Sequence, residues 1–225
     1  MISWHQPGKA SVLVGGQFGS EGKGLTAAWL SHQTREPLTI ATTNAGAQAG
    51  HTTKYKDGQG FVCYHLPTSG VVASRNGAQP YKPYCYLNAG SIIDPELLHR
   101  EIASVGVPDL QVVVHPRAAV ITDEARAEER TPGAGTTKIA STQKGVGAAI
   151  SGKIMRRAKL AGETPAIADA FRCHVLDLNE HMRRMPRASV VVEVPQGFDL
   201  SLNHGLSHPY CTSRDCWVGS GISDA

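Results

Sequence analysis

The sequence predicts an α/β fold with a mainly parallel central sheet flanked by helices. Short apolar runs alternate along the chain with longer stretches of helical character, which is typical of parallel strands joined by helices. The runs 111–114 and 190–194 are apolar instead of alternating, as expected for strands buried on both faces. A glycine-dense segment, 15–24, directly follows the apolar run 11–14. Ligand-binding loops of such sheets follow the carboxyl ends of strands, so this segment is the first candidate site.

The individual elements follow from these runs and from helix start signals. Asp94 can accept a hydrogen bond from a first helical turn, and Pro95 has the fixed φ that suits the first helical position. A second helix is expected to begin at Lys23, where the glycine-dense segment ends. The predicted strands are 11–14, 38–41, 60–65, 85–87, 110–115 and 189–194, and the predicted helices are 23–32, 95–104, 123–130, 147–160 and 167–185.

Length and composition exclude several classes of protein. The chain has 225 residues, of which 41% are hydrophobic, and no internal repeat or low-complexity linker, so we expect one domain over residues 1–225. A net charge of +3 without a long Lys/Arg run argues against a nucleic-acid partner. We expect a cytoplasmic protein with no membrane contact, because the sequence has neither a membrane-spanning apolar stretch nor a signal-peptide pattern. Five cysteines without a CxxC pair favour reduced thiols.

The glycine-dense loop holds a single lysine, Lys23, at the start of its predicted helix. This arrangement brings backbone N–H groups, a helix N-terminus and an ammonium group together, which suits a phosphate. It is not a Walker A loop, because Gln17 and Gly24 occupy the positions where that pattern needs a glycine and a Ser or Thr. The dinucleotide-binding fingerprint does not fit either. From spacing alone, phosphate binding and an ordinary glycine-rich turn both remain open.

Eight segments of the chain resemble, in order, the motifs of the adenylosuccinate synthetase family. The first, GGQFGSEGKG at 15–24, is similar to the family's GQWGDEGKGK, except that Ser20 stands in place of an aspartate. The matches extend to residue 213, and they imply the family's fold and its nucleotide-dependent ligase activity. The other segments are QAGHT (48–52), HLPTSGV (65–71), NAGSIIDP (88–95), HPRA (115–118), STQKGVG (141–147), EVPQG (193–197) and PYCTS (209–213).

The resemblance implies that the first two segments surround the phosphates of a nucleotide triphosphate. His51 is the implied general acid near O6 of the purine, since the pKa of imidazole lies near the working pH. Gly50 and Ser20 are the implied Mg²⁺ ligands. A surface lysine at Lys23 and a structural histidine are the alternatives, and the similar NAG at 44–46 leaves a second register open. The implied nucleotide- and phosphate-binding residues are Ser20, Glu21, Gly22, Lys23, Gly24, Gly50, His51 and Thr52, and the implied catalytic residues are Ser20, Lys23 and His51.

A second glycine-bearing loop, 141–147, is implied to bind the 5′-phosphate of the acceptor nucleotide, with Thr142 as a donor. Arg156 falls on the predicted helix 147–160, and the family's equivalent arginine reaches the phosphate in the partner subunit, so a homodimer is implied. A plain turn and a solvated helix arginine are the alternatives. The implied acceptor-binding residues are Ser20, Gln48, Ala49, Ser141, Thr142, Arg156, Gln196 and Thr212.

Ser20 decides which branch of the family the chain resembles. The family phosphorylates O6 of IMP with GTP and then lets the amine of aspartate displace the phosphate; its aspartate at this position removes the N1 proton. Serine has too high a pKa to be that base, but it is neutral and smaller, so it can admit the C2 amine of guanine and accept a hydrogen bond from it. The substitution and the tail from Gln196 to Cys216 resemble the phage branch, which joins aspartate to dGMP with ATP or dATP.

The resemblance therefore predicts an ATP- and Mg²⁺-dependent ligase that joins L-aspartate to C6 of dGMP, for diaminopurine-containing phage DNA. Its place would be the host cytoplasm. An ordinary adenylosuccinate synthetase acting on IMP with GTP is the alternative within the same class. A nucleotide-binding remnant without activity is the alternative from another class. The family's aspartate-binding loop and its donor-base segment have no counterpart in the chain, so we expect the C-terminal part of the family fold to be missing.

Overall fold

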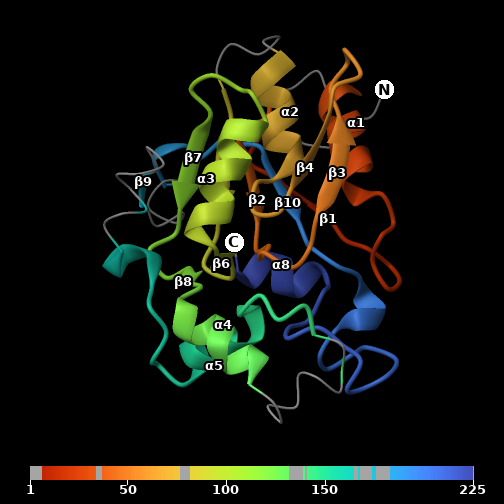
Figure 1. The fold of residues 1–225 in the computed structure, drawn as a ribbon. Helices are drawn as coiled ribbons and strands as arrows, with labels where there is room; N and C mark the ends of the chain where they lie inside the picture. The colour runs from red at the N-terminus through yellow and green to blue at the C-terminus, as the bar shows by residue number, and fades with distance from the viewer. Residues whose placement is uncertain are drawn as a thin grey trace.

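Figure 1 shows the fold of the chain, taken from a computed structural model. The described residues are 7–33, 37–76, 82–131, 139, 141–164, 167, 174–175 and 183–224.

A six-stranded sheet forms the centre of the fold. Its strand order is β1-β10-β2-β5-β7-β9, and every neighbouring pair is parallel. The predicted α/β class with a mainly parallel sheet is therefore confirmed. Its strands are β1 (Ala10–Leu13), β2 (Ile40–Thr43), β5 (Tyr84–Leu87), β7 (Gln111–Val114), β9 (His174–Val175) and β10 (Val190–Glu193).

The inner strands of this sheet, β10, β2, β5 and β7, are buried on both faces, as the apolar character of 111–114 and 190–194 predicted. Val112 and Val114 belong to one hydrophobic cluster, while Val113, between them, belongs to another together with Val190 and Val192. Since successive side chains of a strand point to opposite faces, the two clusters are the cores above and below the sheet.

Among the described residues, four short strands lie outside the central sheet. β3 (His51–Lys54) and β4 (Gly60–Cys63) form an antiparallel hairpin in which His51 lies opposite Cys63. β6 (Ile92–Ile93) and β8 (Ala119–Val120) form a parallel pair. The predicted strand 60–65 thus exists as β4, but it pairs in the hairpin and not in the central sheet.

Helices cover both faces of the sheet (Figure 1). α2 packs on β2, β5 and α1, while α8 packs on β1 and β10. α4 packs against α5, and α5 also contacts β6 and β8. The α-helices are α1 (Lys23–Gln33), α2 (Thr68–Asn76), α3 (Pro95–Ser104), α4 (Asp123–Arg130), α5 (Val146–Ile154) and α8 (Val218–Asp224), and the 3₁₀ turns are η2 (Ala161–Glu163) and η3 (Phe198–Leu200).

The helix predicted over 147–160 ends early, so the prediction that Arg156 lies on a helix is wrong. α5 ends at Ile154, and Arg156 follows in the left-handed conformation with a φ of 59°. The N–H groups of Arg157 and Ala158 both donate to the carbonyl of Gly152, at 2.8 and 3.1 Å. A left-handed residue followed by N–H groups that bond back into the last turn is a common helix C-terminus, and it turns the chain away from the helix axis.

The helix predicted over 167–185 is wrong at 174–175, whereas the described residues 167 and 183–184 of that range are helical. Residues 174–175 form β9, which pairs in parallel with Val113 and Val114 of β7. Residues 168–173 and 176–182 of that prediction lie outside the described residues. Pairing with the sheet edge decides the conformation of 174–175, which local helical preference does not foresee.

The sequence analysis did not predict α2, whose first turn is fixed by a residue far along the chain. The buried carboxylate of Glu193 accepts hydrogen bonds from the backbone N–H groups of Thr68 and Ser69, at 3.1 and 2.8 Å. It also accepts from both hydroxyl groups, at 2.6 and 2.5 Å. A carboxylate at a helix N-terminus satisfies N–H groups that have no partner within the helix.

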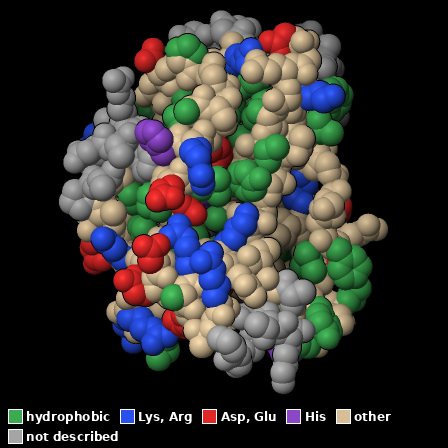
Figure 2. Space-filling model, in the orientation of Figure 1, with side chains coloured by type: hydrophobic (Ala, Val, Ile, Leu, Met, Phe, Trp, Pro, Cys, Tyr) green, Lys and Arg blue, Asp and Glu red, His purple; other side chains and the backbone are tan. Residues whose placement is uncertain are grey.

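In the described part of the chain, four cysteines are present and all are free thiols: Cys63, Cys85, Cys211 and Cys216. None of the described helices is long and apolar enough to cross a membrane. On the face drawn in Figure 2, Lys and Arg side chains are interspersed with Asp and Glu side chains over α3 and α4. This face therefore carries mixed charge.

Candidate functional site

The loop between β1 and α1 folds around the side chain of Glu21. Oε1 of this carboxylate accepts hydrogen bonds from the backbone N–H groups of Gly16 and Gln17, at 2.9 and 3.2 Å. Ser20, at the tip of the loop, is exposed and left-handed, with a φ of 54°. The glycine-dense segment is thus a closed loop whose own carboxylate occupies two of its N–H groups.

Lys23, the first residue of α1, lies under this loop and is only 9% exposed. Its ammonium donates to the backbone carbonyl of Gln196 and lies 3.9 Å from Oε2 of Glu21. Burial lowers the pKa of Lys23, and the charge of Glu21 opposes that shift. A Cβ atom at Gly15 would lie 2.1 Å from the Glu21 carboxylate, 2.8 Å from the Lys23 ammonium and 2.9 Å from the backbone carbonyl oxygen of Gln196, so a larger residue would displace these groups.

The segment after β10 packs directly on the loop. The N–H groups of Phe198 and Asp199 donate to the carbonyls of Gly15 and Gln17, at 2.9 and 3.0 Å. A Cβ atom at Gly197 would lie 2.1 Å from the carbonyl oxygen of Gln17. β1 and β10 are parallel neighbours, so the loops after their carboxyl ends meet.

His51 reaches the same place from the start of the hairpin. Its strand packs so closely on α1 that a Cβ atom at Gly24 would lie 2.9 Å from the carbonyl oxygen of Thr52. Burial lowers the pKa of His51; the carboxylate of Glu193 opposes that shift, and the ammonium of Lys23 adds to it. Neutral imidazole is therefore favoured in the protein alone, and a bound phosphate would favour the protonated form.

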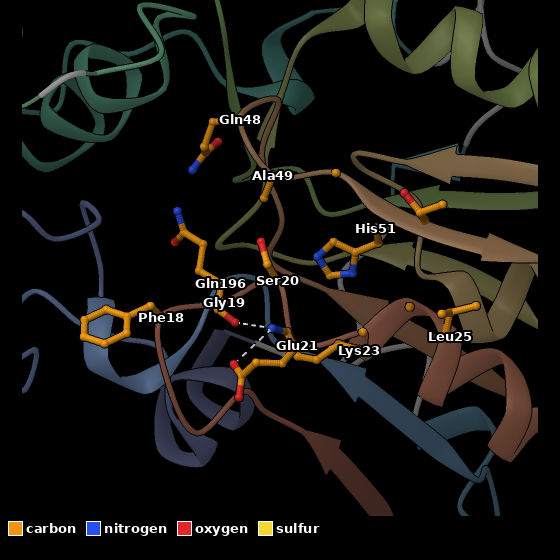
Figure 3. A pocket seen from close by; sticks show the side chains of 14 residues that line it. Phe18, Gly19, Ser20, Glu21, Lys23, Leu25, Gln48, Ala49, His51 and Gln196 are labelled. Atoms are coloured by element: carbon orange, nitrogen blue, oxygen red, sulfur yellow. Dashed lines mark hydrogen bonds and ion pairs between the residues drawn. The ribbon is translucent and has the colours of Figure 1, made fainter.

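These segments enclose a cleft of about 480 Å³ (Figure 3). In Figure 3, Ser20 lies between Gln196 and His51, with Gln48 and Ala49 beside it, whereas the ring of Phe18 points away. Phe18 and Gly19, inside the loop motif, and Leu25, which directly follows it, also line the cleft, and the sequence analysis did not name them as site residues. The predicted residues that line it are Ser20, Glu21, Gly22, Lys23, Gly24, Gln48, Ala49, Gly50, His51, Thr52 and Gln196.

Ser141, Thr142, Arg156 and Thr212, the other predicted acceptor-binding residues, do not line this cleft. The hydroxyl of Ser141 accepts a hydrogen bond from the N–H of the residue after Thr142, at 3.2 Å, within its own loop. Thr212 donates its N–H to the carbonyl of a residue in η3, at 2.8 Å. Arg156 is exposed in the turn after α5. The structure therefore brings the phosphate-loop residues together but leaves these four apart from them.

Strained backbone marks several of these segments. Five non-glycine residues of the described chain have positive φ: Ser20, Asp109, Gln143, Arg156 and Gln196. Three of them are predicted site residues, and Gln143 lies between Thr142 and Lys144 in the second predicted phosphate loop. Left-handed conformations of such residues cost free energy and cluster at functional sites. The strain is an observation independent of the motifs, and it points to the same segments.

The cleft offers little to a metal ion by itself. No group of three or more His, Cys, Asp or Glu side chains that could hold a metal occurs in the described part of the chain. The carboxylate in the loop, Glu21, is already engaged by two N–H groups and lies near Lys23. Ser20 and Gly50, the implied ligands, would supply one hydroxyl and one carbonyl oxygen. Mg²⁺ usually takes carboxylates and substrate phosphates, so these residues do not form a metal site of their own.

The fold and the cleft together define an α/β protein whose glycine loop, helix N-terminus and buried lysine meet at the carboxyl ends of parallel strands. That combination is the architecture of a phosphate-binding protein. Residues 12–165 match the adenylosuccinate synthetase family model. The chain belongs to the adenylosuccinate synthetase family.

Relatives of two kinds are similar to this chain. The adenylosuccinate synthetase of Pyrococcus horikoshii is 32% identical over 95% of this chain and 60% of its own length. The N6-succino-2-amino-2′-deoxyadenylate synthase of Salmonella phage PMBT28 is 33% identical over 92% of this chain and 58% of its own length. The cyanophage S-2L succinoaminodeoxyadenylate synthetase (PurZ), solved with dGMP and with dATP as an energy donor, has a TM-score of 0.79 at 33% identity, over 96% of this chain and 59% of that one. The chain spans about 60% of the length of the curated relatives it matches.

Proposed function

We propose that this chain forms the nucleotide-binding part of a ligase that joins L-aspartate to C6 of dGMP, with ATP or dATP as the phosphoryl donor. The observation that carries the proposal is Ser20, a small neutral side chain exposed in the cleft between Gln196 and His51. The family resemblance implies an aspartate at this position. The PurZ relative with bound dGMP and dATP supports the assignment at 33% identity.

Ser20 gives the proposal its specificity. A hydroxyl is smaller than a carboxylate, so it leaves space beside the C2 edge of the acceptor base. It can also accept a hydrogen bond from the C2 amine of guanine, which IMP lacks. A site that pairs with a substrate amine rejects the analogue without it, because its polar group is then left unpaired.

The remaining cleft residues suit phosphoryl transfer. In the proposed reaction the γ-phosphoryl group of the donor passes to O6 of the purine; the amine of aspartate then forms the C–N bond at C6, and phosphate leaves. Lys23 and the N–H groups of Gly22 and Gly24 would hold the phosphates. His51 would act as the general acid at O6, the oxygen that leaves C6 with the phosphate. We propose that Mg²⁺ enters as a complex with the donor's phosphates, touching Ser20 and Gly50 at most.

The acceptor side of the proposal involves segments outside the cleft. Ser141 and Thr142 would hold the 5′-phosphate of dGMP, and Thr212 would close the pocket. Arg156 is exposed and lies outside the cleft of its own chain. This placement suits the implied homodimer, in which Arg156 of each chain reaches the acceptor phosphate of the other. Since dGMP and ATP are cytoplasmic metabolites, we propose that the protein works in the cytoplasm of a phage-infected cell and contributes to diaminopurine-containing DNA.

A second candidate function has an observation in its favour. The archaeal adenylosuccinate synthetases of P. horikoshii and Archaeoglobus fulgidus are 32% and 31% identical to this chain, about as similar as the phage enzymes. An ordinary adenylosuccinate synthetase would bind IMP and GTP in the same cleft. Sequence similarity alone does not separate the two candidates, so residue 20 has to be tested directly.

The test compares the purified 225-residue chain with its Ser20→Asp and Ser20→Gly variants. Calorimetry gives the Kd for dGMP and IMP, each with and without ATP, and chromatography detects any succinylated nucleotide formed with aspartate and Mg²⁺. We expect the chain to prefer dGMP over IMP by about tenfold or more, and Ser20→Asp to reverse that preference. Ser20→Gly allows the left-handed backbone without strain, so a change in affinity for dGMP in this variant reports the contribution of the hydroxyl group alone. Equal affinity for IMP would overturn the dGMP assignment. Binding without any product, even in a chain extended to full length, would favour the non-catalytic alternative.

A further inference from the structure

One guanidinium group ties together the loops that follow two neighbouring strands. Nη1 of Arg214 donates to the backbone carbonyl of Asn44, at 2.5 Å, and to that of Gly90, at 2.7 Å. Asn44 directly follows β2, and Gly90 lies in the turn after β5; the two strands are parallel neighbours. The side chain therefore bridges two carboxyl-terminal loops of the sheet from a third segment, 209–216.

The positive charge of the Arg214 side chain is balanced by the carboxylate of Asp224. Asp224 of α8 accepts a hydrogen bond from the side-chain amide of Asn44, at 2.6 Å, so Asn44 is held through its main chain and its side chain. Burial lowers the pKa of Arg214, and the charge of Asp224 opposes that shift. A Cβ atom at Gly90 would lie 2.3 Å from the Asp224 carboxylate. These close contacts show that the cluster of Asn44, Gly90, Arg214 and Asp224 is tightly packed.

Asn44 begins the segment that enters the cleft. Residues 45–50 read Ala-Gly-Ala-Gln-Ala-Gly, and His51 follows them. Such small side chains bury little apolar surface, so backbone contacts contribute most of what holds the segment. The N–H of Ile92 donates to Ala45, at 3.1 Å, and the Lys144 ammonium donates to the carbonyl of Ala47, at 2.9 Å. Arg214 holds the segment where it leaves the sheet, and Lys144 holds its middle.

We propose that Arg214 is a positioning residue: by gripping Asn44 and Gly90 it holds the segment 44–50 so that Gln48 and His51 face the acceptor nucleotide. It lies two residues after Thr212, so it also links the proposed acceptor segment to the one that carries His51. The functional half of this inference rests on the proposed function. The structural half does not, because the contacts of Arg214 exist without any ligand.

The experiment compares Arg214→Met and Arg214→Lys with Arg100→Met, a control at an exposed arginine on α3. Hydrogen exchange of the intact 225-residue chain reports on the amides of 45–51, with those of β7 as an internal reference. Calorimetry gives the Kd for dGMP and for ATP. We expect Arg214→Met to speed exchange at 45–51 by about tenfold or more while β7 is unchanged, which is the size expected when hydrogen bonds to a charged group are lost. The Kd for dGMP should rise about tenfold, and that for ATP less than about threefold.

Lysine can keep one of the two carbonyl contacts, so Arg214→Lys should give intermediate values, and Arg100→Met should match the wild-type chain. Unchanged exchange at 45–51 in Arg214→Met would overturn the inference. Faster exchange with an unchanged Kd for dGMP would overturn its functional half. If the wild-type chain binds no dGMP, the proposed function fails, while the exchange data still decide whether Arg214 holds the segment. If Arg214→Met does not fold, Arg214→Lys decides, since wild-type exchange and affinity in that variant contradict the inference.

Discussion

The two sides of the cleft are built in different ways. On the phosphate-loop side, one continuous motif from Gly15 to Gly24 folds around its own carboxylate, and one further segment, 196–199, packs on it. On the acceptor side, the predicted residues come from separate segments, and Ser141, Thr142 and Thr212 stay outside the cleft. A contiguous motif can therefore supply most of a site from one segment, whereas a site made of distant segments depends on the contacts that join them.

The largest expected effect is on the phosphate-loop side. Replacing Lys23 by Met removes the buried ammonium beside the loop, and we expect the Kd for ATP to rise roughly 100-fold, the upper range for a charged hydrogen-bonding group. Calorimetry on the chain measures it. The control is Lys9→Met, an exposed lysine before β1 that should bind ATP like the wild-type chain. An ATP affinity that is equal in all three proteins would show that this loop is an ordinary turn.

Two adjacent glycines test whether the loop is preformed by packing. A Cβ atom at Gly15 would meet Glu21 and Lys23 at 2.1 and 2.8 Å, whereas one at Gly16 would have nothing within 4 Å. We expect Gly15→Ala to lower the free energy of unfolding by about 1–3 kcal/mol. Gly16→Ala, its matched control, should change it by less than about 0.5 kcal/mol. Urea unfolding measures both, and similar values for the two variants would contradict the packing described for this loop.

A smaller effect is expected on the acceptor side. Thr142→Val removes one neutral donor and keeps the shape of the side chain, so we expect the Kd for dGMP to rise about fivefold and that for ATP to stay unchanged. Calorimetry with each nucleotide separately measures the contrast with Lys23→Met. Should Thr142→Val weaken ATP and dGMP equally, the division of the cleft into two sides would be wrong.

The smallest expected effect concerns the support behind the acceptor side. Asp94 caps α3 through the N–H of Leu97, at 3.1 Å, and pairs with Arg126 of α4, at 3.0 Å. Burial tends to raise the pKa of Asp94, but these two partners outweigh it, so the pKa is lowered. A lowered pKa stabilises the fold above the ordinary pKa of aspartate, and the contribution is lost as the pH falls through the folded value.

Asp94→Asn keeps a capping side chain and removes the charge. At pH 7 we expect it to lower the free energy of unfolding by about 0.5–1 kcal/mol, the range of a partly exposed ion pair. Urea unfolding at pH 7 and pH 3 should show this difference shrinking at the lower pH. A difference that is as large at pH 3 as at pH 7 would mean that the ion pair does not stabilise the fold.

Sequence reasoning succeeded where the determinants are local. The glycine loop, the start of α1 and the Asp94 cap of α3 each depend on residues within one short segment. Sequence reasoning failed where the determinants are distant in the chain. The first turn of α2 binds the carboxylate of Glu193, 125 residues away, and no local sequence pattern predicts that contact. In the same way, residues 174–175 form a strand because they pair with β7 at the edge of the sheet.

The acceptor side could be predicted only as a set of residues. The motif analysis named Ser141, Thr142, Arg156 and Thr212, but their distance from the cleft depends on how α5 ends and on how the last segment folds. The motif analysis also did not identify the role of Arg214, because the residues next to an arginine in the sequence do not indicate which carbonyl groups its side chain will contact. These are tertiary contacts, and one sequence carries no local signal for them.

The carboxylate of Glu21 has a consequence for how a nucleotide arrives. The N–H groups of Gly16 and Gln17, which would suit an incoming phosphate, are already taken by this side chain. An anion that binds to these two N–H groups must first displace the Glu21 carboxylate. Binding therefore replaces one negatively charged hydrogen-bond acceptor by another. In the proposed ligase, such an exchange would weaken the net attraction of the loop for phosphate and would therefore speed the release of the spent nucleotide.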